Sequence, residues 1–263
     1  MDKKISAVII TRNVENVLPD CLYHLQWADE IIVADSGSKD KTIEIAKKYG
    51  AKVFQKKWEG YVKQKNFAIS KAKGKWILSI DADEIVTDDL KKEIIAVINS
   101  DNAKDGYFIK NKNFYYGKFL KYGQLKKVYI LRLFKRGKGK FQDTAVHEVV
   151  NVNGQTGKLK NFLIHYTTEN IYKHIEKINK YTELEVINLK SKNYKPTGYS
   201  VLLKWIFVFI KNYFFKFGFL DGINGLIFNV ISAYYVLIKE IKYAANYGFR
   251  DIKFFKTLFK KAK

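Results

Sequence analysis

The first part of the chain alternates between short apolar runs and longer stretches with helical spacing of apolar residues. The apolar runs, rich in β-branched residues, predict buried strands at Ile5–Ile10, Glu30–Ala34, Ala51–Phe54 and from Trp76 onward. Helical spacing between them predicts helices over Val14–Trp27, Lys41–Tyr49 and Val62–Ala72. Strand and helix in this order indicate βαβ units and a parallel sheet.

The run Trp76–Glu84 ends in acidic residues and predicts a buried strand that carries carboxylates at its tip. Side chains alternate along a strand, so Asp81 and Asp83 are expected on the same side. Two carboxylates at this spacing can share one divalent cation such as Mg²⁺ or Mn²⁺. In the alternative, Asp83 and Glu84 cap a helix that continues through Leu90.

Polar residues follow the other predicted strands as well. Thr11, Arg12 and Asn13 follow the first strand, and Asp35 follows the second. Ligands of parallel sheets bind beyond the carboxyl ends of the strands, so these residues are expected to border one crevice. Neither a Gly-x-Gly-x-x-Gly nor a Walker loop is present, which disfavours dinucleotide and P-loop chemistry. Asp35 suits hydrogen bonds to a base or ribose; in the alternative it bonds its own backbone in a turn.

After Gly106 the pattern changes to shorter predicted strands joined by polar turns. These strands are Gly106–Lys110, Tyr129–Phe134 and Val149–Val152, and a basic loop, Arg136–Lys140, precedes the last of them. Aromatic residues in Asn113–Gly117 are of the kind that stack on sugar faces, with packing in a core as the alternative.

The C-terminal third is helical and rich in aromatic and basic residues. Ile171–Leu189 is a predicted helix that ends before Pro196. Lysines interrupt Val201–Phe219, and the uncharged stretch Ile223–Ile238 is shorter than the ~20 residues of a membrane span. The tail Lys253–Lys261 predicts an interfacial helix in anionic headgroups, with ordinary bundle helices as the alternative.

Charge and cysteine content narrow the class of protein. The formal net charge of +22 indicates an anionic partner, such as nucleic acid, an anionic membrane or a phosphorylated substrate. The single cysteine, Cys21, excludes an intramolecular disulfide and zinc sites built on several thiolates, and it is expected in the core. The N-terminal residues lead directly into a strand, so no secretory signal and a cytosolic location are expected.

Four motifs occur in a characteristic order: Ser6–Asn13, Ile32–Asp40, Gln64–Ala68 and Leu78–Glu84. Together they resemble the nucleotide-binding half of glycosyltransferase family 2, which has the GT-A fold. Three later patterns, Val128–Lys135, Val146–Glu148 and Phe217–Gly222, are similar to the bacterial branch that holds lipopolysaccharide core β-1,4-glucosyltransferases.

The resemblance implies roles for the matching residues. Asp35 would bind the uracil or ribose, and Asp81 the ribose or the metal. Asp83 would ligate Mn²⁺ or Mg²⁺ that bridges the donor's diphosphate. Apart from the resemblance, His165 is a candidate to complete this metal site, with a structural role as the alternative. Lys65 stands where the family often has a basic residue facing the pyrophosphate; a solvated helix lysine is the alternative. Thr11, Arg12 and Asn13 complete the expected donor-binding residues.

Inverting glycosyl transfer also needs a group that takes the proton of the acceptor hydroxyl. Asp143, His147 and Glu148 lie in the stretch where this family places its base. Glu148 is the preferred candidate and Asp143 the second. His147 is a candidate for binding metal or substrate, with a structural role as the alternative.

The sequence thus predicts an α/β, GT-A fold with a mostly parallel sheet and helices on both faces over residues 1–165. Residues 1–100 form its nucleotide-binding half and 101–165 its acceptor half, and 166–263 form a helical, basic, membrane-associating region.

The predicted activity is inverting, metal-dependent transfer of a sugar, with UDP-glucose as the expected donor. The acceptor is lipid-linked, in lipopolysaccharide core or another cell-surface glycan, and the enzyme is cytoplasmic and peripheral on the inner face of the cytoplasmic membrane. Its expected partners are a UDP-sugar, the lipid-linked saccharide and an anionic membrane surface, without nucleic acid.

Two alternatives belong to other functional classes. One is a basic protein that binds nucleic acid or anionic membranes without catalysis, although no helix-turn-helix, zinc-finger or RNA-recognition pattern is present. The other is a degenerate family member that binds nucleotide without turnover. The intact Asp35, Asp81 and Asp83 argue against this second alternative.

Overall fold

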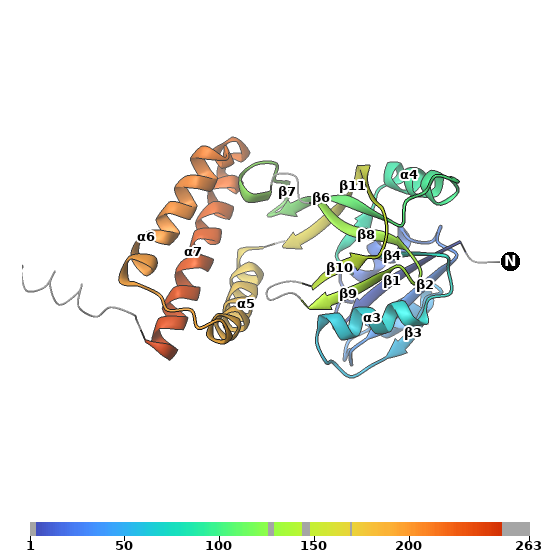
Figure 1. Ribbon diagram of the computed structural model, residues 1–263, viewed down its shortest axis with the longest axis horizontal. Helices are drawn as coiled ribbons and strands as arrows, with labels where there is room; N and C mark the ends of the chain where they lie inside the picture. The colour runs from blue at the N-terminus through green and yellow to red at the C-terminus, as the bar shows by residue number, and fades with distance from the viewer. Residues whose placement is uncertain (1–3, 126–128, 144–147, 169, 249–263) are drawn as a thin grey trace, which may run out of the picture. The chain divides into compact units, whose positions relative to one another are not determined.

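The chain divides into two compact units. Strands β6 (Gly106–Tyr115) and β11 (Thr156–Thr168) each begin in the first unit and end in the second. The structure, a computed structural model, describes residues 4–125, 129–143, 148–168 and 170–248 (Figure 1). Unit 1 comprises Met1–Lys112 and Lys127–Tyr166, and unit 2 comprises Asn113–Lys126 and Thr167–Lys263.

The N-terminal part of unit 1 is a parallel ladder of four strands with the spatial order β3-β2-β1-β4. The strands are β1 (Ile5–Thr11), β2 (Glu30–Asp35), β3 (Lys52–Gln55) and β4 (Trp76–Ser79). They are connected by α1 (Leu18–Tyr23), α2 (Thr42–Lys48) and α3 (Tyr61–Lys71). The predicted βαβ units are therefore confirmed, although α1 is shorter than the helical spacing suggested.

The rest of the sheet introduces antiparallel pairs. Its order continues β4-β8-β6-β11-β5, and β7 (Lys118–Phe119) pairs with β6. Strands β8 (Tyr129–Lys135) and β5 (Glu84–Val86) pair antiparallel with β4 and β11, respectively. The sheet is therefore mixed, with four parallel strands at its N-terminal side and antiparallel pairs beyond β4. The predicted basic loop is partly a strand, because β9 (Gly139–Asp143) forms a hairpin with β10 (Glu148–Val152).

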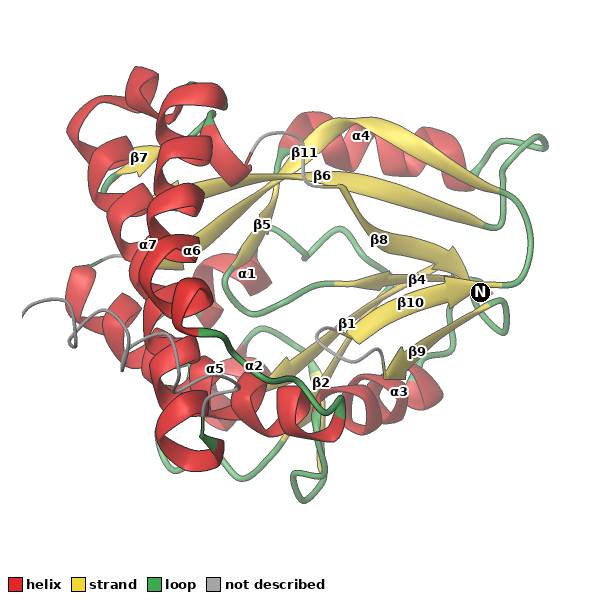
Figure 2. Cartoon of the chain, turned by 60° about the vertical axis from the view of Figure 1, so that its left-hand side comes forward, coloured by secondary structure: helices red, strands yellow, loops and turns green. Residues whose placement is uncertain are grey.

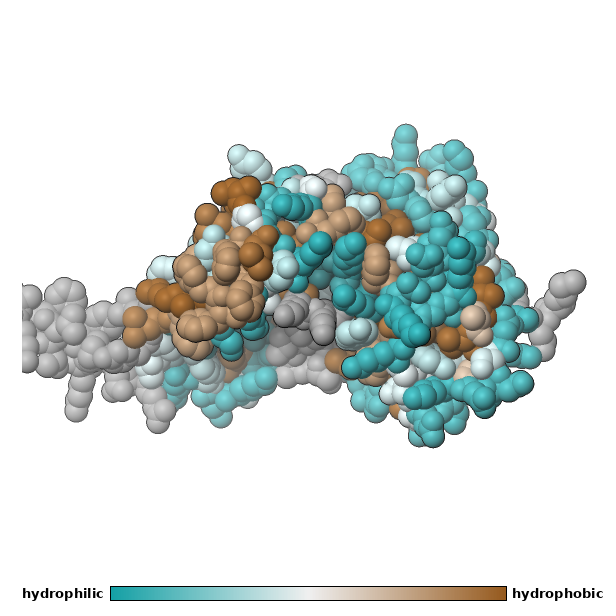
Figure 3. All heavy atoms as spheres, turned by 90° about the horizontal axis from the view of Figure 1, so that it is seen from above, coloured by the Kyte–Doolittle hydropathy of each residue, from teal (hydrophilic) through white to brown (hydrophobic). Residues whose placement is uncertain are grey.

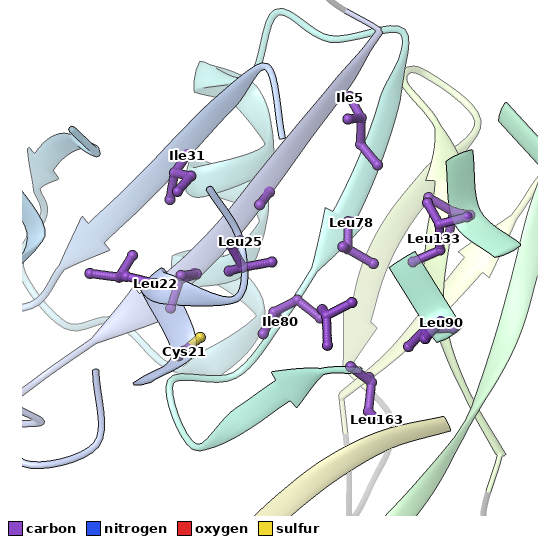
Figure 4. Close-up of a cluster of buried hydrophobic side chains, with 14 of the residues drawn as sticks. Ile5, Cys21, Leu22, Leu25, Ile31, Leu78, Ile80, Leu90, Leu133 and Leu163 are labelled. Carbon is purple, nitrogen blue, oxygen red and sulfur yellow. The ribbon is translucent and has the colours of Figure 1, made fainter. Parts of the chain in front are cut away.

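The side chains of β1 point alternately to the two faces of the sheet, and each face carries its own hydrophobic core. Ile5, Ala7 and Ile9 point into a core shared with α1, α2 and α4 (Asp88–Ile98). Figure 4 shows this core, in which Cys21 is fully buried as predicted. Val8 points to the other face, where α3 and the β9–β10 hairpin complete the second core. Because the helices lie on both faces, the strand ends stay open to ligands.

Unit 2 is built around the long helix α7 (Gly222–Tyr247), which packs against α5 (Ile171–Ser191) and α6 (Gly198–Ile210) (Figure 2). Between α6 and α7 lie a π-helical turn, η2 (Lys211–Phe215), and a 3₁₀ turn, η3 (Gly218–Asp221). A second 3₁₀ turn, η1 (Gly123–Leu125), belongs to the same unit.

The segment Asn113–Lys126 joins unit 2 through buried side chains. Asp221 accepts hydrogen bonds from the backbone N–H groups of Lys121 and Tyr122, at 3.0 and 2.9 Å. Tyr115 is buried, and its ring lies 4.8 Å from that of Phe228. Tyr115 is therefore a core residue of unit 2, as the packing alternative for these aromatic residues proposed.

Within the described residues, the stretch Gly218–Tyr247 is long and apolar enough to cross a membrane. Length and composition alone support this, as they would for the core helix of a water-soluble domain, and 39% of its most apolar window is buried inside the structure. The uncharged stretch seen in the sequence, Ile223–Ile238, is shorter than a span, whereas the stretch in the structure is longer.

The packing of α4 leads to a first prediction. Ile94 has no exposed side-chain surface, whereas its neighbour Ile95 is 38% exposed. We expect Ile94→Ala to lower the free energy of unfolding by about 2–5 kcal/mol because it leaves a cavity. Ile95→Ala should cost less than about 1 kcal/mol. Urea unfolding followed by tryptophan fluorescence measures both variants, since Trp27, Trp58 and Trp76 report on unit 1. Equal losses would contradict the described packing of α4.

Candidate functional site

The tips of β1 and β2 are joined by a hydrogen-bonded loop that Asp35 organises. Thr11 and Asp35 are register partners, and the Thr11 hydroxyl donates to Asp35 Oδ2 at 2.9 Å. The backbone N–H groups of Gly37 and Ser38 donate to Asp35 Oδ1, both at 2.9 Å. Asp35 is fully buried, and Gly37 has φ +89°, a conformation that favours glycine. Asp35 thus has the contacts of the turn alternative, and its binding to a nucleotide stays a prediction.

Asn13 and Arg12 border the same loop in different ways. Asn13 Oδ1 accepts the backbone N–H of Lys39 at 2.8 Å, which ties the loop after β1 to the loop after β2. Arg12 is exposed, and no hydrogen bond or ion pair joins its side chain to another described residue. Of the residues predicted at this tip, Arg12 is therefore the one available to an anionic ligand.

Asp81 and Asp83 do not lie on a strand, because β4 ends at Ser79 and β5 starts at Glu84. They lie in the turn between these strands, so the expected alternation does not apply and the two side chains contact different partners. The helix-capping alternative is also wrong, because α4 is capped by Thr87, whose hydroxyl accepts the Leu90 N–H at 3.3 Å.

Asp81 is held by two cationic side chains. Lys65 Nζ lies 3.0 Å from Asp81 Oδ1, and Arg132 Nη2 lies 2.5 Å from Asp81 Oδ2. Burial of Asp81 would raise its pKa, but the charges of Arg132 and Lys65 outweigh this and hold the pKa well below its usual range. The Lys65 side chain is only 6% exposed, so Lys65 is not a solvated helix lysine.

Arg132 also pairs with Glu84, which has no exposed surface. Arg132 Nη2 lies 2.5 Å from Glu84 Oε1, and Glu84 Oε2 accepts the backbone N–H of Asp81 at 3.0 Å. Asn111 donates a further hydrogen bond to Glu84 at 3.1 Å. Burial raises the pKa of the Glu84 carboxyl, and the charge of Arg132 opposes that rise. One buried guanidinium therefore fixes both ends of the turn that contains Asp83.

Asp83 contacts β11. Its Oδ2 lies 3.3 Å from His165 Nε2, and its backbone carbonyl accepts the Tyr166 N–H at 2.9 Å. Burial lowers the pKa of His165, but the hydrogen bond to Asp83 and the nearby carboxylates outweigh this effect and raise it. The structure thus brings together Asp83 and His165, the second of which was a candidate to complete the metal site.

The geometry of Asp83 and His165 suits a shared divalent cation. Octahedral ligands at ~2.1 Å from Mg²⁺ are ~3 Å apart, close to the observed separation of these two atoms. Both oxygens of Asp81 already contact cationic nitrogens, so a metal there would displace Lys65 or Arg132. Among the described residues, no group of three or more His, Cys, Asp or Glu is placed to hold a metal ion. The residues fit a two-ligand site whose remaining ligands come from a donor diphosphate and water.

The candidate bases lie on the β9–β10 hairpin. Asp143 ends β9 and Glu148 begins β10, and the two are register partners. The side chains of both residues, and His147 as a whole, lie outside the described part of the structure. Asn66 links this hairpin to α3: its amide donates to the Phe141 carbonyl and accepts the Phe141 N–H, both at 2.9 Å. The motif containing Lys65 thus also positions the strand that leads to Asp143.

Sequence reasoning assigned no role to Arg132 or Asn111. A signal for Arg132 was present, because an arginine inside the apolar run Tyr129–Phe134 requires a buried partner. Its partners could not be identified from the sequence, since Asp81 and Glu84 are far away in the chain.

A family model described as glycosyl transferase family 2 matches residues 6–153. The chain belongs to glycosyltransferase family 2. An uncharacterized glycosyltransferase of Rickettsia typhi is 32% identical over 246 residues, which cover 88% of this chain and 84% of that protein. A lipopolysaccharide core biosynthesis glycosyltransferase, LpsC of Rhizobium meliloti, is 26% identical over 245 residues. The match covers 90% of this chain and 91% of LpsC.

A solved structure also shows the fold. Residues 1–349 of Staphylococcus aureus TarS, in complex with UDP-GlcNAc, match with a TM-score of 0.50 and 18% identity. The match covers 91% of this chain and 92% of that one. This glycosyltransferase therefore has the predicted GT-A fold.

The charge network around Arg132 gives a second prediction. Arg132→Met leaves the buried Glu84 carboxylate without its cation, so we expect a loss of about 3–5 kcal/mol in the free energy of unfolding. The double variant Arg132→Met/Glu84→Met should regain much of this loss, because no charge then stays buried and unpaired. Urea unfolding followed by tryptophan fluorescence measures both variants.

Lys135→Met is the matched control on the same strand. The Lys135 side chain is 38% exposed and pairs with Asp105, so its loss should cost no more than about 1 kcal/mol. A loss for Arg132→Met no larger than that of this control would contradict the network.

Proposed function

We propose that this family 2 enzyme is an inverting, metal-dependent glycosyltransferase that uses a UDP-sugar, with UDP-glucose as the specific donor. The acceptor is a lipid-linked saccharide of lipopolysaccharide core or another cell-surface glycan. The observation that carries the proposal is the placement of Lys65, Asp81, Asp83 and His165 around one turn next to the end of β4. The name of LpsC, a lipopolysaccharide core biosynthesis enzyme, supports the acceptor class.

The charge balance of this turn supports the need for a metal. Among the described residues, the permanently charged cations that pair with Asp81, Asp83 and Glu84 are Lys65 and Arg132. When His165 is neutral, as a metal ligand must be, the cluster carries a net negative charge, and a nucleoside diphosphate would add more. Asp83 and His165 would hold a divalent cation, whose positive charge would offset this repulsion.

The protein side chains then have separate tasks. Asp83 and His165 hold Mn²⁺ or Mg²⁺, which, when bound, stabilises the negative charge that develops on the departing diphosphate. Asp81 binds the ribose, and Lys65 and Arg12 add positive charge near the donor's phosphates. Asp35 holds the loop that borders the uracil, with Thr11 and Asn13 as its supports.

The transfer step itself needs one base. The acceptor hydroxyl oxygen attacks the anomeric carbon from the side opposite to UDP, and the bond from that carbon to the phosphate oxygen breaks. Its electron pair stays on UDP, and the hydroxyl proton moves to Glu148, or to Asp143 as the second candidate. The result is inversion at the anomeric carbon.

The location follows from the two substrates. A UDP-sugar is water-soluble and a lipid-linked acceptor is not, so the enzyme would act in the cytoplasm as a peripheral protein on the inner face of the membrane. We assign catalysis to residues 1–165 and membrane association to residues 166–263, and the partners are the donor, the acceptor and an anionic membrane surface.

Calorimetric titration of UDP tests the donor site and gives a third prediction. We expect micromolar binding in the presence of Mn²⁺ and loss of this binding with a chelator. Asp83→Asn should lose the metal-dependent part of UDP binding and all metal-dependent turnover of UDP-glucose. Asp101→Asn, a change at an exposed acid away from the turn, is the control and should behave like the unmodified protein. Unchanged metal-dependent binding by Asp83→Asn would refute the metal assignment.

A fourth prediction distinguishes the two candidate bases. Glu148→Gln should lower turnover by about 10²–10⁴-fold with little change in UDP binding, since a base acts only in the chemical step. Asp143→Asn should retain most of the activity. Single-turnover transfer assays and UDP titration on both variants measure the difference, and the reverse result would make Asp143 the base.

A further inference from the structure

Unit 2 exposes a group of large apolar side chains between residues 207 and 223. Six of them are at least half exposed, and we call this group the aromatic tip: Phe207, Phe214, Phe215, Phe217, Leu220 and Ile223. Phe215 is the most exposed of the six, at 76%. Figure 3 shows hydrophobic residues gathered over unit 2. Contiguous apolar surface of this kind on a folded unit marks an interaction site.

The backbone holds the aromatic tip in place. The chain reverses between α6 and α7, with Phe217 in the left-handed region at φ +60°. At Gly218 an added Cβ would lie 2.8 Å from the Asn212 carbonyl oxygen, so only glycine permits this close approach. The ring of Tyr213 lies 5.1 Å from that of Phe214 and 6.2 Å from that of Phe219. The exposed ring of Phe214 is therefore anchored to Tyr213, which is partly buried.

The charges around the aromatic tip are all positive. Between Pro196 and Leu220 the chain has three lysines, Lys204, Lys211 and Lys216, and no acidic residue. Lys211 Nζ lies 5.9 Å from the centre of the Phe207 ring. The aliphatic part of the Lys211 side chain therefore lies along the apolar surface.

The acidic residues of the described part of unit 2 lie elsewhere. Asp221 and Glu240 are buried, and their carboxylates are satisfied within the unit. The other acids among residues 170–248 are Glu176, Glu183 and Glu185, and all three lie on α5. The surface of α6, the two turns after it and α7 thus presents cations without exposed anions.

We propose that the aromatic tip inserts into the headgroup region of an anionic phospholipid bilayer. Exposed phenylalanines beside lysines, with no exposed acid, match an anionic bilayer, because its interior is apolar and its headgroups are negatively charged. The inference deepens the membrane association of the proposed function, on which it rests, by naming the residues that enter the membrane. It places them in α6, η2, η3 and the start of α7, away from the C-terminal tail and without a span by α7.

Vesicle sedimentation with two matched double variants tests the proposal. Phe214→Ser/Phe215→Ser removes two exposed rings of the aromatic tip. Leu184→Ser/Ile187→Ser removes two comparably exposed apolar side chains from α5, beside its glutamates. We expect the first variant to bind phosphatidylglycerol-containing vesicles about tenfold or more weakly. The second variant should bind like the unmodified protein. Circular dichroism and thermal unfolding establish that both variants fold.

Charge variants test the anionic component. Lys211→Gln/Lys216→Gln should weaken binding to phosphatidylglycerol vesicles by roughly fivefold per lysine and leave binding to pure phosphatidylcholine vesicles unchanged. Equal loss on both lipids would overturn the electrostatic part of the proposal.

Other outcomes would assign a different occupant to the surface. Equal vesicle binding by both double variants would overturn the role of the aromatic tip. Light scattering that shows a dimer in the absence of lipid, lost in Phe214→Ser/Phe215→Ser, would assign the surface to a second copy of the chain. Vesicle-bound protein that resists alkaline carbonate would instead indicate that α7 spans the bilayer.

The donor site can fail independently of this proposal. Vesicle binding requires neither UDP nor metal, so an absence of UDP binding in calorimetry would remove the proposed donor chemistry and leave the vesicle result standing. UDP binding that is equal in both double variants, together with tip-dependent vesicle binding, would support both proposals separately.

Discussion

The candidate site depends on one buried guanidinium. Arg132 is 4% exposed, and its charge is balanced by Asp81 and Glu84 on both sides of a short turn. An arginine removed from water must be paired, and its pairing restricts the backbone that carries its partners. The turn is therefore fixed by β8, a strand that is distant in sequence. Since Asp83 lies within this turn, its position next to His165 follows from the same constraint.

Because of this arrangement, Asp81 and Asp83 have different electrostatic surroundings. Asp81 has a lysine and an arginine on its two oxygens, so its negative charge is already compensated within the protein. Within the described part of the chain, the side chain paired with Asp83 is the imidazole of His165, which is neutral when it is not protonated. A cation that arrived with a nucleoside diphosphate would gain more from Asp83 than from Asp81, because it would replace a contact with an imidazole and not ion pairs with a lysine and an arginine. The different charge balance of Asp81 and Asp83 thus distinguishes two residues that look equivalent in the sequence.

Local patterns predicted the parallel ladder correctly, because its strands are continuous β-branched runs separated by helical spacing. They also extended the fourth strand too far, through Asp81. The strand ends at Ser79 because the following residues turn and Glu84 starts a new strand against β11, a pairing set by long-range contacts. Nothing in the sequence indicated that Lys121 and Tyr122 belong to unit 2. Their place there depends on hydrogen bonds to Asp221, about a hundred positions away in the chain. The roles of Asp143 and Glu148 rest on the sequence alone.

A transferase that takes a water-soluble donor and a lipid-linked acceptor has to present two kinds of surface. Unit 1 buries its apolar residues on both faces of one sheet and leaves polar groups at the strand ends. Unit 2 instead leaves phenylalanines exposed, although burying them would stabilise an isolated domain. Such exposure is costly in water unless another phase covers it. Under the proposal made for the aromatic tip, the strongly positive charge of the chain has a physical use, because lysines beside exposed rings would attract an anionic surface from a distance and the rings would hold the protein there.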